Sequence, residues 1–312
     1  MNKILITGGM GFIGSHLVNL LIKKGYGEKI IIVDNLSNSK YKKFRKIKFF
    51  KLDCSQKKNL KKLDKYKIDI IFHIAASSSG ENSFYETEKD MKYNLLATLN
   101  LLELAKKNKS KKFIFTSTMS VYGDPIRLPV DEKAIKVPKS FYAIHKSSSE
   151  EYIKIFSNYG ISSTILRLFN VYGPGQNLEN MRQGMLKIYL TQMIKHKKLE
   201  IKGNLDRFRD FVYIDDVISA LYKSMKNNEK LVILNIGSGK KTKIRNLIKI
   251  LNKELGTKIK PIISKNTPGD QFGIFGSVKK ANYKIKWKPK INLRVGIKNF
   301  IGYIKDNVQS KN

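Results

Sequence analysis

The sequence has a single cysteine, Cys54, so no disulfide can form within the chain. This suits the reducing cytoplasm, where we expect the protein to work. No run of apolar residues is long enough to span a bilayer. The first apolar stretch, residues 3–7, leads directly into a glycine-rich segment, which leaves no room for a signal peptide before it. We therefore expect neither a membrane span nor a disulfide framework.

Acidic residues are also few. The chain has 25 Asp and Glu against 61 Lys and Arg, a formal net charge of +36. Such a charge is compatible with a nucleic-acid or membrane-surface partner. However, the lysines are spread along the whole chain, and arginine, the better residue for bidentate phosphate recognition, is scarce. We favour lysine-rich solvated surfaces and expect no nucleic-acid and no membrane partner, although the positive field would attract an anionic substrate.

Short apolar runs rich in Ile, Val and Phe alternate with helical patterns along the chain. Continuous apolarity suits strands that are buried on both faces. The rhythm predicts an α/β fold with a doubly wound parallel (Rossmann) sheet. The predicted strands are residues 3–7, 30–34, 48–52, 70–75, 113–117, 164–169 and 232–236, and the predicted helices between them are 12–24, 88–107, 142–158 and 214–226.

The pattern loosens after about Asn170, where Gly173-Pro174-Gly175 interrupts it. Further helices are predicted at residues 181–196, 242–255 and 293–305. We expect a smaller C-terminal substrate-binding region, with residues 214–236 returning to the main sheet. The predicted division is a Rossmann domain of residues 1–170 and 211–236, and a substrate-binding region of residues 171–210 and 237–312.

Gly8, Gly11 and Gly14 follow the first predicted strand and open a helix. Glycines at this spacing allow a tight turn and a close approach of the backbone to a pyrophosphate at the helix N-terminus. Asp34 ends the second strand, twenty positions after Gly14, where a carboxylate can bind a ribose diol. Because that carboxylate would repel a 2′-phosphate, we expect NAD rather than NADP. Asp53 ends the third strand and is either an adenine contact or a solvated carboxylate.

Tyr142 and Lys146 are four positions apart on a predicted helix, so their side chains share one face. An unperturbed tyrosine has a pKa of ~10, too high for a base near neutral pH. A neighbouring ammonium and an oxidised nicotinamide would both lower it, so that the phenolate could take a proton from a substrate hydroxyl. This spacing is common by chance, but Thr118 supports it: it lies at the carboxyl edge of the fifth strand and could orient the reacting hydroxyl towards Tyr142.

With these motifs the chain resembles the NAD-dependent sugar-nucleotide epimerase/dehydratases, extended short-chain dehydrogenase/reductases, and most closely the UDP-glucose 4-epimerase type. The resemblance covers nearly the whole chain. Further segments that carry it are Val33-Asp34-Asn35-Leu36-Ser37-Asn38-Ser39, His73-Ile74-Ala75-Ala76, Tyr93-Asn94-Leu95, Arg167-Leu168-Phe169-Asn170-Val171-Tyr172-Gly173-Pro174-Gly175, Arg209-Asp210-Phe211-Val212-Tyr213-Ile214-Asp215-Asp216-Val217, Asn235-Ile236-Gly237-Ser238-Gly239 and Pro268-Gly269-Asp270.

The resemblance implies a role for each matching residue, with Thr118, Tyr142 and Lys146 as the catalytic residues. The expected NAD contacts are Gly8, Gly11, Phe12, Ile13 and Gly14 at the pyrophosphate, Asp34 and Asn35 at the adenosine ribose, Asp53 and Cys54 beside the adenine, Ala75 and Asn94 along the cleft, and Tyr142 and Lys146 at the nicotinamide ribose. The expected contacts with a nucleotide-sugar substrate are Thr118, Asn170, Arg209 and Asp270. Arg207 is either a further contact or a surface arginine.

No metal site is predicted. A homodimer is expected by analogy, although the apolar positions Leu95, Leu99, Leu102, Tyr152 and Phe156 could equally pack internally.

The two residues after Thr118 predict the type of reaction. Dehydratases of the family carry an acidic pair there and decarboxylases a Glu, whereas this chain has Met119 and Ser120. Neither is a general acid or base near neutral pH, so epimerisation at carbon 4 through a 4-keto sugar is predicted. The alternatives are an NAD(P)-dependent 4-ketoreductase or dehydrogenase and, in another class, a non-catalytic NAD- or RNA-binding scaffold. Ser78 and Thr267 stand where some relatives have Lys and Arg, which leaves the base and the sugar open.

Overall fold

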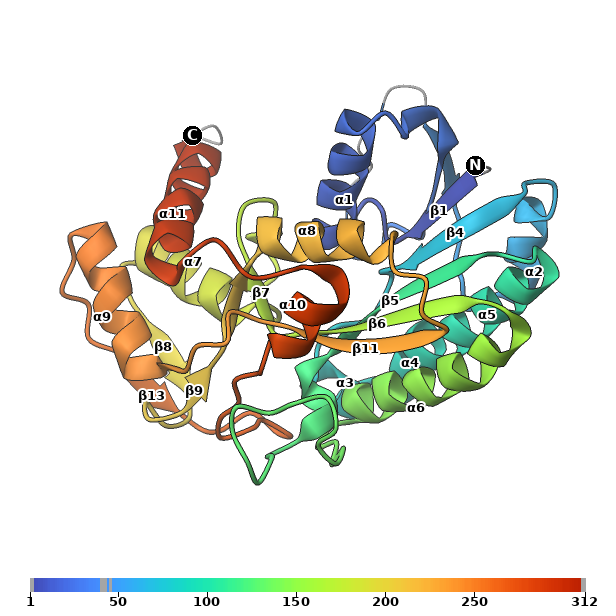
Figure 1. The fold of residues 1–312 in the computed structure, drawn as a ribbon. Coiled ribbons are helices and arrows are strands. Elements are labelled where there is room, and N and C mark those ends of the chain that lie inside the picture. Colours follow the sequence, from blue (N-terminus) through green and yellow to red (C-terminus); the bar gives the residue numbers. More distant parts are fainter. Residues whose placement is uncertain (1–2, 40–43, 45–46, 310–312) are drawn as a thin grey trace.

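The computed structural model describes residues 3–39, 44 and 47–309 of the chain. A parallel sheet of seven strands lies at its centre, in the order β11-β6-β5-β4-β1-β2-β3 (Figure 1). The chain starts in the middle, builds outward to β3, and returns to the other side of β1 to add β4, β5, β6 and β11. This confirms the predicted doubly wound parallel sheet. The strands, each within two residues of its prediction, are β1 (Lys3–Thr7), β2 (Ile30–Asp34), β3 (Lys48–Lys51), β4 (Ile68–His73), β5 (Lys112–Thr118), β6 (Ser162–Leu168) and β11 (Leu231–Ile236).

Helices cover both faces of the sheet, which explains why the strands are continuously apolar. In β1, Ile4 and Ile6 belong to the apolar cluster that includes α1 (Phe12–Lys23) and α8 (Ile214–Ser224). Leu5 points the other way, into the cluster that includes α5 (Ala97–Lys107) and α6 (Phe141–Phe156). A strand between two helical layers has no face left for polar side chains.

The predicted helix over residues 88–107 is interrupted in the structure. It consists of α4 (Thr87–Met91), a π-helical turn η3 (Lys92–Leu96) and then α5. A π-helical turn changes which residues share a face without changing the composition, so hydrophobic periodicity does not reveal it. The predicted helix over residues 181–196 begins only at Met185, because Gly184 before it has a left-handed φ of 80°.

A second group of short elements lies beyond one end of the sheet, around α7, α9 and α11 (Figure 1). Its two-stranded pairs are β7 with β10, β8 with β13 and β9 with β12. Among the described residues, no helix is both long enough and apolar enough to cross a membrane. The remaining elements are η1 (Gly27–Lys29), α2 (Lys57–Leu60), η2 (Lys61–Leu63), α3 (Asn82–Tyr85), η4 (Met119–Tyr122), η5 (Ser157–Tyr159), β7 (Asn170–Tyr172), α7 (Met185–His196), β8 (Glu200–Lys202), β9 (Phe208–Arg209), β10 (Phe211–Tyr213), β12 (Thr242–Lys243), α9 (Ile244–Leu255), β13 (Ile262–Ser264), α10 (Lys279–Ile285) and α11 (Leu293–Gln309).

Candidate active site

The turn after β1 is too tight for any residue but glycine at two positions. Gly8 has a left-handed φ of 71°, and a Cβ there would lie 2.7 Å from the backbone nitrogen of Ala75. A Cβ on Gly14 would lie 2.1 Å from the carbonyl oxygen of Gly8. The first turn of α1 therefore packs directly on the turn that precedes it, at the point where the strand order reverses between β1 and β4. Ligands of such sheets bind at this point.

The N-terminus of α1 is prepared for an anion. Gly11 is its N-cap residue, no side chain of the described residues caps the helix, and the first turn contains no acidic residue. The free amides and the positive end of the helix dipole are therefore not neutralised by the side chains of the helix itself. A dinucleotide pyrophosphate fits this arrangement, as the glycine spacing predicts.

The Asp34 carboxylate is fixed beside the same turn. It accepts hydrogen bonds from the backbone amides of Met10 and Leu36 at 3.0 and 2.8 Å. Asp53 and Cys54 follow β3 and lie close by, as the electrostatic effect of Asp34 and Asp53 on the Cys54 thiol indicates. Burial is the largest cause that raises the pKa of that thiol to about 12, followed by the two carboxylates. The structure thus brings together the residues predicted for the ribose and the adenine.

Ala75 and Asn94 lie along the neighbouring segment after β4. The Ala75 amide donates to the Thr7 carbonyl oxygen at 3.1 Å, which holds this segment against the glycine turn. Asn94 comes from the π-helical turn and donates its side-chain amide to the Ser77 carbonyl oxygen at 2.9 Å. The Asn94 Oδ1 atom is buried and has no hydrogen-bond partner among the described residues. A free buried acceptor is expected to find a partner in a ligand or a water.

The three predicted catalytic residues are together. Thr118 is the last residue of β5, and its hydroxyl shares a hydrogen bond with the Tyr142 phenol. Tyr142 lies in the first turn of α6, which Ser140 caps by accepting from the Ala143 amide at 3.2 Å. One turn later, the Lys146 ammonium lies 3.9 Å from the centre of the Phe115 ring of β5. Both α6 side chains therefore face the carboxyl end of β5.

Burial dominates the electrostatics of this group. It raises the pKa of Tyr142 to about 12, against the lowering effect of the Thr118 hydrogen bond. It lowers the pKa of Lys146 to about 7, against the raising effects of Glu150 and Asp90. The expected lowering of the Tyr142 pKa by Lys146 is therefore not found among the described residues, where burial of the phenol dominates.

Sequence reasoning missed the side chains that anchor α6. The buried Glu150 accepts from the Ser117 hydroxyl at 2.6 Å and from two nitrogens of Arg167 at 2.9 and 2.7 Å. This charge-assisted network ties α6 to β5 and β6 below the catalytic residues. A second buried pair joins α6 to α4, where His145 Nδ1 lies 2.7 Å from Asp90 Oδ2. Two features of the sequence could have indicated these pairs: Glu150, one helical turn after Lys146, and His145, directly before Lys146.

On the opposite side, the buried Arg207 and Arg209 form a cluster with the partly exposed Asp270. Asp270 bonds both guanidinium groups, one with each carboxylate oxygen. Arg209 also donates to the carbonyl oxygens of Phe208, Phe272 and Gln271, at 2.8, 3.2 and 2.8 Å. Arg207, for which a surface position was equally open, is only 5% exposed. Two buried positive groups share one carboxylate, which leaves the cluster with an excess of positive charge.

Asn170 and the loop after β7 connect the two sides. The Asn170 side-chain amide donates to the Asp210 carbonyl oxygen at 3.1 Å and lies 3.8 Å from the Met119 sulfur. Further along, His16 of α1 is hydrogen-bonded to the Pro174 carbonyl oxygen at 3.0 Å. The predicted substrate contacts are thus tied to β5 through Met119 and to the glycine turn through α1.

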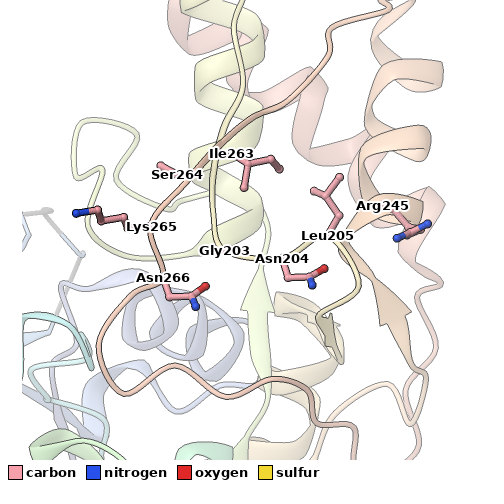
Figure 2. Close-up of a pocket in the computed structure, with 8 residues that line it drawn as sticks. All are labelled: Gly203, Asn204, Leu205, Arg245, Ile263, Ser264, Lys265 and Asn266. Atoms are coloured by element: carbon pink, nitrogen blue, oxygen red, sulfur yellow. The ribbon is translucent and has the colours of Figure 1, made fainter.

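Figure 2 shows an open hollow of about 580 Å³ in the second group of elements. Its residues come from the turn after β8, from the start of α9 and from β13 with the segment after it. None of the residues predicted for NAD, substrate or catalysis lines it. The hollow therefore lies outside the predicted contacts, but it borders Arg207, which donates to the Asn204 carbonyl oxygen at 3.2 Å.

Comparison with known proteins agrees with the geometry. The model of the NAD dependent epimerase/dehydratase family matches residues 4–237. A Methanocaldococcus jannaschii protein provisionally named UDP-glucose 4-epimerase is 38% identical, covering 97% of this chain and 99% of its own. The dTDP-D-glucose 4,6-dehydratase of Dictyostelium discoideum is 35% identical, covering 76% and 58%. The crystal structure of the Thermotoga maritima UDP-glucose 4-epimerase with UDP-glucose is 35% identical with a TM-score of 0.94, covering 98% and 99%.

The family match spans the sheet, the glycine turn and the Tyr142 and Lys146 helix. The similarity to the Methanocaldococcus and Thermotoga proteins extends over nearly the full chain. The chain belongs to the NAD-dependent epimerase/dehydratase family.

Proposed function

We propose that this protein epimerises a nucleotide-diphosphate sugar, most simply a UDP-hexose, at carbon 4 through a transient 4-keto sugar. The observation that carries the proposal is the group of Thr118, Tyr142 and Lys146 at the carboxyl end of β5. It is supported by the similarity to UDP-glucose 4-epimerases. The substrate diphosphate would bind at Asn170 and Arg209, with Asp270 and the excess positive charge of Arg207 beside them.

NAD would be held by Gly8, Gly11, Phe12, Ile13 and Gly14 at its pyrophosphate, by Asp34, Asn35, Asp53 and Cys54 at its adenosine end, and by Ala75, Asn94, Tyr142 and Lys146 towards the nicotinamide. Bound there, it supplies a reversible hydride acceptor and a positive charge that favours the Tyr142 phenolate. Tyr142 takes the proton from the sugar 4-hydroxyl and later returns it, Thr118 orients that hydroxyl, and Lys146 stabilises the phenolate. The anchored diphosphate lets the sugar turn its other face before it is reduced.

Met119 and Ser120 favour epimerisation over elimination. The Met119 sulfur lies beside Asn170, and the Ser120 hydroxyl accepts from Thr118 at 3.1 Å. Neither side chain can carry a proton to or from a sugar carbon near neutral pH. The reaction therefore stops at oxidation and re-reduction, without the loss of water that the name of the Dictyostelium relative describes.

We further propose a homodimer formed through α6. Ile144, Tyr152 and Ile155 of this helix are exposed large apolar side chains, as is Met91 of α4. Leu102, for which the sequence left an interface or internal packing open, is buried in the core next to the sheet. An apolar helical surface of this kind is typical of a subunit interface. Light scattering would measure the mass of the particle.

Incubation of the pure protein with a panel of nucleotide sugars, followed by proton NMR, tests the proposal. An epimerase converts its substrate to a mixture with the 4-epimer without added NADH. A ketoreductase or dehydrogenase would instead need stoichiometric NAD(H), and would lose its cofactor on gel filtration. Signals of a dehydrated or decarboxylated product in the spectrum would contradict the interpretation of Met119 and Ser120.

A further inference from the structure

Asp90 is a buried carboxylate that the proposed mechanism does not use. It lies on α4, 2% exposed, two residues before the start of the π-helical turn. Its Oδ2 atom is hydrogen-bonded to His145 Nδ1 at 2.7 Å, and its Oδ1 atom has no hydrogen-bond partner among the described residues. A buried, half-satisfied carboxylate is costly, so it calls for a compensating group nearby.

Lys146 has the complementary deficiency. It is 1% exposed, and within the described part of the chain its ammonium makes a contact with the Phe115 ring but no hydrogen bond or ion pair. Lys146 directly follows His145, and its ammonium interacts electrostatically with Asp90. Glu150 also acts on Lys146, but its carboxylate already accepts from Arg167 and Ser117. Asp90 is thus the neighbouring carboxylate with an oxygen still free.

We propose that Asp90, held in place by His145, is the counter-ion of Lys146 and thereby sets the pH range in which Tyr142 exchanges its proton. The inference rests on the proposed function of Tyr142 and Lys146 and adds a positioning residue to them. The free Asp90 oxygen would reach the ammonium through one buried water, to which the free Asn94 Oδ1 would also bind.

The surrounding charges leave this role to Asp90. The groups of α6 that face Asp90 are Tyr142, His145 and Lys146. The nearby titratable group of β4 is His73, which stays neutral because burial lowers its pKa. The other charged side chains of α4 and η3 lie at the surface, where Glu86 pairs with Lys89 and Glu88 with Lys92. Beside α6, the residues of α3 and of the carboxyl end of β5 carry no charged side chain, only hydroxyl, amide and aromatic groups.

Asp90→Asn tests the proposal because it removes the charge but keeps the acceptor for His145. The Asp90 charge raises the pKa of both Lys146 and Tyr142. Its removal should move both limbs of the pH profile of kcat to lower pH, on the order of one pH unit. Glu88→Gln is the matched control, since it removes the same charge from the exposed side of the same helix. It should leave both limbs in place.

A second readout does not depend on turnover. The ionisation of Tyr142 can be followed by ultraviolet difference spectroscopy of the NAD-loaded protein against its Tyr142→Phe variant. The same downward shift in Asp90→Asn supports the inference even if no nucleotide sugar is converted, an outcome that would count against the proposed function alone. A lower rate with both limbs and the Tyr142 titration unchanged would show that Asp90 is merely structural and overturn the proposal.

His145 variants keep the test decisive if Asp90→Asn does not fold. His145→Asn offers an amide N–H in place of Nδ1–H and should retain the original Tyr142 titration. His145→Leu removes the donor and should move the titration in the direction of Asp90→Asn, by a smaller amount. An unchanged titration in His145→Leu would contradict the proposed hold of His145 on Asp90.

Discussion

The two sides of the candidate active site are built in different ways. On the cofactor side, the backbone makes the site: two glycines close the turn, and an uncapped helix presents its amides. On the substrate side, side chains make it, with Arg207 and Arg209 sharing the Asp270 carboxylate between short strands. The first kind of site depends on shape and the second on charge. A substitution on one side should therefore weaken binding on that side only. Loss of the Tyr142 phenol, which lies between them, should stop the chemical step while both ligands still bind.

The largest effect is expected for Tyr142→Phe. Loss of the phenol removes the group that exchanges the proton, so turnover should fall by roughly 10²–10⁴-fold or more. NAD should remain bound through its other contacts and the affinity for UDP should be unchanged, which chromatography and calorimetry would measure. Full activity in this variant would remove Tyr142 from the mechanism.

Gly14→Ala should break the cofactor side alone. Its Cβ would lie 2.1 Å from the Gly8 carbonyl oxygen, so the turn must open. We expect a loss of about 1–3 kcal/mol in the free energy of unfolding, together with weaker NAD binding. Gly302→Ala in α11 is the control, because a Cβ there meets no atom within 4 Å. It should be neutral or stabilising, by less than ~1 kcal/mol. Equal effects of the two variants in thermal unfolding would contradict the shape argument.

Asp270→Asn should weaken the substrate side alone. It leaves two buried guanidinium groups without their shared carboxylate, so they lose their fixed positions. We expect KM for the nucleotide sugar to rise by about tenfold, with NAD binding unaffected. Asp206→Asn is the control, because its ion pairs with Lys243 and Arg245 are exposed. That variant should change KM by less than about twofold.

The last prediction concerns the stability of the fold and the charge of the buried Lys146. Burial lowers its pKa to about 7 from an ordinary value of 10.5, so between these pH values the unfolded chain binds more protons at this residue than the folded chain. Stability from this group therefore rises with pH in that window. Lys146→Met should be more stable than the native chain at pH 7, and the difference should shrink by roughly 1 kcal/mol per pH unit towards pH 9. Denaturant unfolding at both pH values measures it, and a constant difference would contradict it.

The same contrast explains what the sequence could predict. The glycine turn, Asp34 and the seven strands of the sheet follow from local spacing and apolar runs, and these strands agree with prediction. Arg207 was ambiguous because its burial depends on Asp270, which is 63 positions away. Asp90 and His145 were missed for a similar reason, since α4 and α6 meet only in the folded chain. The π-helical turn that contains Asn94 has no signature in hydrophobic periodicity.

Arg209 is held to an unusual degree by its own protein. Its guanidinium is already fixed by three carbonyl oxygens and one carboxylate, so it has little freedom to follow a moving ligand. A substrate whose diphosphate is bound by so rigid a guanidinium clamp could move only at its sugar end. Such a pivot would give the sugar two opposite presentations without releasing it.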